Sequence, residues 1–71
     1  MQLDAIKLPS KTLYMPKGHG DLLRQIAYQF LTPDSTNFLP RIEDVSMDPA
    51  TLQECKTADN HVYWIGPAIF A

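Results

Sequence analysis

The chain has 71 residues, 45% of them apolar, with six basic and eight acidic side chains and a net charge of −2. This length predicts one domain over residues 1–71, and the apolar content excludes a disordered chain. The weak negative charge offers no bulk attraction to duplex DNA or to anionic lipid, so we expect neither duplex DNA nor a membrane as a partner.

The core of so short a chain is small, and such a core supplies roughly 3–5 kcal/mol of stability. Cys55 is the only cysteine, so no disulfide forms within the chain, and with His19 and His61 the ligands are too few for a structural zinc site. We therefore expect no cofactor, and stability must come from efficient packing or from self-association. The amino terminus lacks the features of a secretion signal and no apolar span would cross a bilayer, which favours the cytoplasm.

Two short strands are expected first. Ile6 and Leu8, then Leu13 and Met15, alternate with polar or amphipathic neighbours in the period-two pattern of half-buried strands. Pro9-Ser10 interrupts the pattern, and a hairpin turn there is slightly preferred over one bent edge strand.

A helix is expected from Asp21, at the position of an N-cap, to a stop at Pro33. Its apolar residues recur at the spacing that forms one stripe on a helix. They are Leu22, Leu23, Ile26, Ala27, Phe30 and Leu31.

The middle of the chain predicts an edge strand and a second helix. Residues 38–45 are apolar at several positions, but Pro40 restricts them to an edge. Asp48-Pro49 has the chemistry of a helix start, and a short helix ending near Thr57 would place Cys55 on its apolar stripe.

The segment from His61 to Ile65 is aromatic and β-branched and is expected to be the central strand. Val62 and Trp64 would point to one face of the sheet, and Tyr63 and Ile65 to the other. The fold class predicted from these elements is α+β: two helices packed on one face of a three- or four-stranded, mostly antiparallel sheet.

Apolar side chains are crowded near the carboxyl end. One layer of helices covers only one face of the last strand, so the other face needs the chain's own tail, a second copy or a foreign partner. The predicted partner-binding residues are Tyr63, Trp64, Ile65, Ile69 and Phe70. A homodimer is the simplest form of this hypothesis, and burial of the same residues in the chain's own core is about equally compatible with the pattern.

An anion site is the alternative. Lys17, Gly18, His19 and Gly20 stand between a predicted strand and a helix, where free backbone amides hold phosphates. Residues 1–33 carry four basic and two acidic side chains, against two and six in residues 34–71. A weak binder of nucleic acid or anions would use this basic half, although no phosphate-binding glycine motif is met and Asp21 would repel an anion.

Catalysis is not expected. Cys55 with His19 or His61 would need an orienting group and an oxyanion site, and so small a scaffold does not readily supply them. The preferred function is a small, non-enzymatic binding or regulatory module that acts through protein–protein contact, as an inhibitor, adaptor or assembly component.

Overall fold

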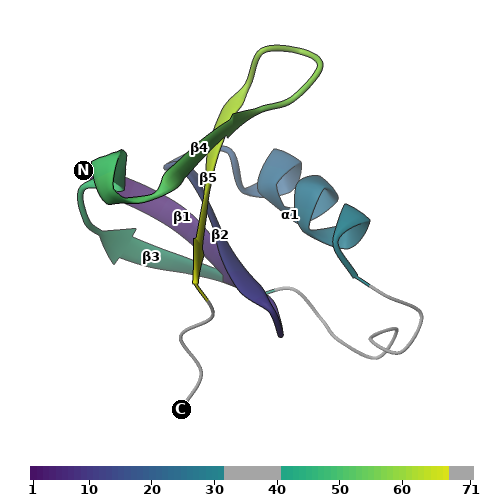
Figure 1. The fold of residues 1–71 in the computed structure, drawn as a ribbon, viewed down its shortest axis with the longest axis horizontal. Helices are drawn as coiled ribbons and strands as arrows, with labels where there is room; N and C mark the ends of the chain where they lie inside the picture. The colour runs from purple at the N-terminus through teal and green to yellow at the C-terminus, as the bar shows by residue number, and fades with distance from the viewer. Residues whose placement is uncertain (32–40, 68–71) are drawn as a thin grey trace.

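The computed structural model describes residues 1–31 and 41–67. Within them the chain forms a five-stranded antiparallel sheet and one α-helix (Figure 1). In chain order the elements are β1 (Gln2–Lys7), β2 (Lys11–Pro16), α1 (Gly20–Gln29), β3 (Ile42–Ser46), the short 3-10 turn η2 (Pro49–Thr51), β4 (Gln53–Lys56) and β5 (Val62–Pro67).

The sheet has the strand order β3-β1-β2-β5-β4. The expected hairpin at Pro9-Ser10 is confirmed: β1 pairs with β2, and the Leu8 amide donates to the Lys11 carbonyl at 2.8 Å. The predicted edge strand is confirmed over 42–46, where β1 is the one strand that pairs with β3 among the described residues. Residues 38–40 lie outside that part of the chain. The strands at the two edges are therefore β3 and β4.

Helix α1 covers one face of the sheet, and its apolar stripe is confirmed. Leu23, Ile26 and Ala27 are buried in one cluster with Ile6, Leu13 and Met15 of the sheet and with Leu8 of the β1–β2 turn. The N-cap position is held by His19, whose side chain makes no capping bond, and Asp21 lies in the first turn instead. A carboxylate in the first turn still favours the helix through its dipole.

The opposite face of the sheet carries a second apolar cluster. Its buried members are Leu3, Ala5, Tyr14 and Trp64. Met47 and Leu52, which flank η2, pack against the cluster. The connection from β3 to β4 therefore links the two edge strands across this face. Within the described residues, α1 covers one face of the sheet and this connection lies on the other.

The predicted second helix is wrong, and with it the predicted fold of two helices on three or four strands. Asp48 does cap a turn, since its Oδ1 accepts the Ala50 amide at 3.0 Å, but only the three residues of η2 follow. The segment 53–56 then pairs with β5 as β4. A helix this short is marginal by itself, whereas pairing with β5 satisfies the backbone directly.

The position of β5 also differs from the prediction. It is an interior strand with neighbours on both sides, but β2 occupies the middle of the sheet. The alternation of its side chains is as predicted: Val62 and Trp64 join the second cluster, and Tyr63 and Ile65 join the cluster beneath α1.

Candidate functional site

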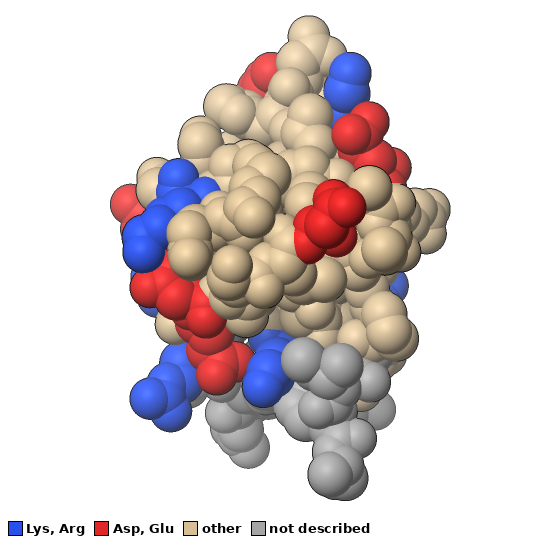
Figure 2. All heavy atoms as spheres, turned by 90° about the vertical axis from the view of Figure 1, so that its left-hand side faces the viewer, with Lys and Arg blue, Asp and Glu red and all other residues tan. Residues whose placement is uncertain are grey.

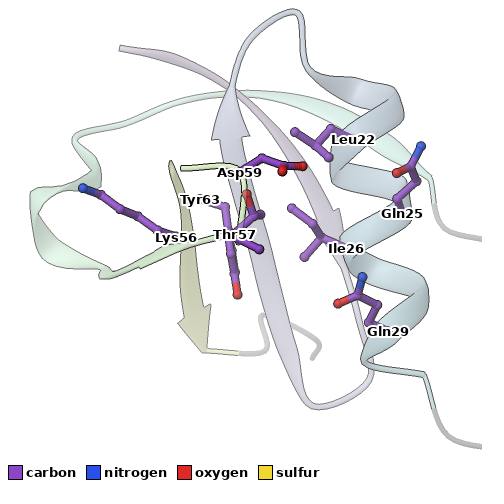
Figure 3. A pocket seen from close by; sticks show the side chains of 9 residues that line it. Leu22, Gln25, Ile26, Gln29, Lys56, Thr57, Asp59 and Tyr63 are labelled. Carbon is purple, nitrogen blue, oxygen red and sulfur yellow. The ribbon is translucent and has the colours of Figure 1, made fainter. Parts of the chain in front are cut away.

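A cleft opens between α1 and the β4–β5 hairpin, with a volume of about 420 Å³. It forms because α1 packs on β1 and β2 rather than on β4. Its apolar walls are Leu22 and Ile26 from the helix and Tyr63 from β5, and Figure 3 shows the two helix side chains extending toward the hairpin. This volume lies in the lower part of the range of small ligand sites, about 300–1,000 Å³.

The rim of the cleft is polar. Gln25 and Gln29 stand one helical turn apart on α1, and Thr57 and Asp59 face them from the hairpin. Lys56 also lines the cleft, with its side chain directed away from the helix in Figure 3. Glutamine amides donate and accept hydrogen bonds, so this rim matches the alternating donors and acceptors of a peptide backbone.

Tyr63, one of the apolar walls of the cleft, has a raised pKa. Burial raises the pKa of Tyr63 above its ordinary value of 10.0, and the neighbouring Cys55 acts in the same direction. The tyrosine therefore stays neutral to higher pH than a free phenol and acts as an apolar wall with one hydroxyl.

The structure separates the predicted partner-binding residues. Trp64 is 9% exposed and belongs to the core on the helix-free face, while Tyr63 and Ile65 are half-buried beneath α1. Both faces of β5 are thus covered by the chain itself, so the expected lack of cover is not found. Of these residues only Tyr63 lines the cleft, and Ile69 and Phe70 lie outside the described residues.

The loop proposed for anions is already occupied by a carboxylate. Asp4 Oδ2, in a side chain only 8% exposed, accepts the Gly18 amide at 3.1 Å. Lys17 Nζ contacts an Asp44 oxygen at 3.0 Å, and His19 Nδ1 lies 3.0 Å from the Pro16 carbonyl. Gly20 follows as the first residue of α1, with the Asp4 carboxylate close by. A bound anion would have to displace these internal contacts and approach Asp4.

The basic half of the sequence does not form a basic surface here. Lys7 and Lys17 contact Glu43 and Asp44 of β3, at 3.5 and 3.0 Å. Lys11 lies over the Phe30 ring, 4.4 Å from its centroid. On the face drawn in Figure 2, lysine and arginine side chains lie beside acidic ones.

The candidate nucleophile and bases are not assembled in the cleft. Cys55 is half-buried on β4 opposite Tyr63, not on a helix, and neither it nor a histidine lines the cleft. His19 and His61 bring their ring centroids within 6.2 Å of each other. In residues 1–31 and 41–67, no three histidine, cysteine or acidic side chains are grouped closely enough to hold a metal ion.

Four residues of the cleft rim were missed by sequence reasoning. Gln25 and Gln29 fall within the predicted first helix but outside its apolar stripe, and Thr57 was predicted only as the end of a second helix. The spacing of the two glutamines was visible, but its meaning depends on the hairpin opposite, which the sequence did not predict.

No helix in the described residues is long and apolar enough to cross a membrane. Comparisons with protein-family models, curated proteins and solved structures found no match to this chain. The function of the cleft is therefore inferred from its residues alone.

Proposed function

We propose that this chain is a small binding module without catalysis of its own, which holds a short extended segment of a partner protein in the cleft between α1 and the β4–β5 hairpin. The observation that carries this proposal is the cleft itself: apolar walls from Leu22, Ile26 and Tyr63 beneath a rim of amides and a hydroxyl. Sites with apolar walls and a few placed polar groups are typical of ligand recognition. The half-buried, free Cys55 is compatible with a reducing compartment, and the cytoplasm remains the proposed location.

The expected segment carries one bulky apolar side chain and a backbone within reach of Gln25 and Gln29. Asp59 is the charged side chain at the rim, since the Lys56 side chain is directed away from the helix, so we do not expect a strongly acidic peptide. An apolar side chain of leucine or phenylalanine size suits the volume of about 420 Å³, with room for the flanking backbone.

The test is selection of binders from a random peptide display library, followed by affinity measurements on variants. The double variant Gln25→Ala, Gln29→Ala should weaken the selected peptides about tenfold or more, because each lost hydrogen bond contributes about 1 kcal/mol. The matched control is Tyr28→Ala on the same helix, since Tyr28 is 53% exposed and does not line the cleft. Peptides that bind the wild type and the double variant equally would refute the proposed site.

A further inference from the structure

The open edge of β4 is the feature that carries a further inference. We propose that β4 pairs with β4 of a second copy of this chain, antiparallel about a two-fold axis at Cys55. This pairing uses the outward backbone groups of the strand edge, so it does not rest on the peptide-binding function. In the strand order β3-β1-β2-β5-β4, β4 is the last strand and β5 is its one neighbour among the described residues. An edge strand presents a row of unused amides and carbonyls, which is a template for pairing.

The register with β5 shows which groups of β4 face outward. The Thr57 amide donates to the His61 carbonyl at 2.9 Å, so these two residues form a hydrogen-bonded pair at the end of the hairpin. Hydrogen-bonded and non-hydrogen-bonded pairs alternate along an antiparallel ladder, so Cys55 is directed to β5 as well. Glu54 and Lys56 therefore direct their amides and carbonyls away from β5, toward the open edge.

Charge selects one register among those that use these outward groups. An axis at Glu54 would set Glu54 against its own copy, and an axis at Lys56 would set two lysines against each other. Like charges directly opposite each other destabilise a strand pair. An axis at Gln53 would bring Lys56 against Ala50, which lies in η2 rather than in a strand.

An axis at Cys55 places outward backbone groups opposite each other and opposes no like charges. Each Glu54 then lies opposite Lys56 of the second copy, and both residues have outward backbone groups that can exchange bonds in pairs. Their side chains are exposed, on the face of the sheet opposite α1, because β4 pairs them with Trp64 and Val62. The four residues of β4 thus form a strand edge that is complementary to itself in charge and in hydrogen bonding.

The other edge lacks this property. Strand β3 carries Glu43 and Asp44 and no basic residue, so pairing with its own copy would gather four acidic side chains. The lysines that neutralise β3 come from β1 and from the loop after β2. Self-pairing is therefore assigned to β4.

Cys55 supplies a reporter for the register. Opposite residues in a non-hydrogen-bonded pair have Cα atoms about 4.5 Å apart, which lies within the range that a disulfide spans. With a mild disulfide oxidant added, each Cys55 thiol loses its proton, the two sulfurs join and two electrons pass to the oxidant. A cysteine at position 53 would lie about 13 Å from its own copy in this register, beyond the reach of a disulfide.

The test is sedimentation equilibrium of the wild type and three charge variants from low to several hundred micromolar. The wild type should form a weak dimer, because the paired edge is short. Glu54→Lys and Lys56→Glu should each raise the dissociation constant about tenfold, and the double variant Glu54→Lys, Lys56→Glu should restore it, because the opposite charges face each other again. All four should keep the same urea midpoint, since both side chains are exposed.

Cross-linking provides the second measurement. The oxidant should convert the wild type to a covalent dimer and should leave the variant Gln53→Cys, Cys55→Ser monomeric. A folded wild type that stays monomeric throughout the concentration range would overturn the proposal, as would a double charge variant that does not recover dimerisation. Equal cross-linking at positions 53 and 55 would also overturn it. Peptide binding is tested separately through Gln25 and Gln29 of α1, which lie outside β4, so either proposal can fail without the other.

Discussion

Trp64 should be among the most sensitive positions for stability. Its indole lies in the cluster on the helix-free face, where Tyr14 is its partner on β2 and Leu52, the residue before β4, packs against the same cluster. Truncating a buried tryptophan to alanine costs about 3–5 kcal/mol. A core of this size supplies roughly 3–5 kcal/mol in total, so Trp64→Ala should leave folded and unfolded chains in comparable amounts at 25 °C.

The assay is urea denaturation followed by far-ultraviolet circular dichroism, because the variant has lost the chain's one tryptophan. Trp64→Phe is the matched control, and it should cost less, about 1–2 kcal/mol, since it keeps an aromatic ring in the same place. In the wild type, quenching of Trp64 fluorescence should be weak and independent of protein concentration. A Trp64→Ala variant with the wild-type urea midpoint would show that the side chain is not in the core. Quenching of the wild type that changes with protein concentration would indicate that Trp64 lies at an interface between copies.

Three further changes test individual features of the structure. Thr12→Val should raise stability by about 1 kcal/mol in urea denaturation, because the buried Thr12 hydroxyl has no hydrogen-bond partner among the described residues; a loss of stability would reveal a partner. Gly18→Ala should lower stability by about 1–2 kcal/mol, because Gly18 has φ +99°, which alanine adopts only at a cost. An added Cβ would meet no atom within 4 Å, so the cost is that of the backbone conformation alone. Gly18→Asn should cost less, and a Gly18→Ala variant with the wild-type urea midpoint would contradict the positive φ at this turn. Because the pKa of Tyr63 is raised, its contribution to stability is fully present below the unfolded-state value near 10.0 and declines as pH rises through the higher folded-state value. Between about pH 9 and pH 11, the free energy of unfolding should therefore fall less steeply for Tyr63→Phe than for the wild type. Parallel curves for the two proteins would refute the raised pKa.

Local pattern was enough to predict the helix and the first hairpin. The stripe around Leu23 has the helical spacing over several turns, and no competing pattern overlaps it. Pro9-Ser10 is a local turn signal between two alternating segments, and the chain forms the turn there. In both cases the information lies within a dozen residues.

Long-range pairing decided the elements that were missed. The caps at Asp48-Pro49 are real, yet they start a 3-10 turn, because the residues after Leu52 gain a ladder with β5 that no local pattern reveals. Burial of Trp64 depends likewise on the connection that carries Met47 and Leu52 across the far face. The cleft could not be predicted, because one of its walls comes from a hairpin whose first strand, β4, had been predicted as part of a helix.

Pairing through β4 would place the two clefts of a dimer on the same face of its sheet. In an antiparallel pair, opposite residues point to the same face of the sheet, so a two-fold axis at Cys55 runs perpendicular to the sheet and keeps both copies of α1 on one side. Tyr63, opposite Cys55 on β5, would then form part of the floor on both sides of that axis. The two clefts would open on the same face as a symmetric pair, and a partner with two matching segments would gain from binding both at once. Such a partner should bind Glu54→Lys more weakly than the wild type, whereas a single peptide should bind both equally, because Glu54 does not line the cleft. Association through β4 would thereby convert a weak peptide site into a bivalent one.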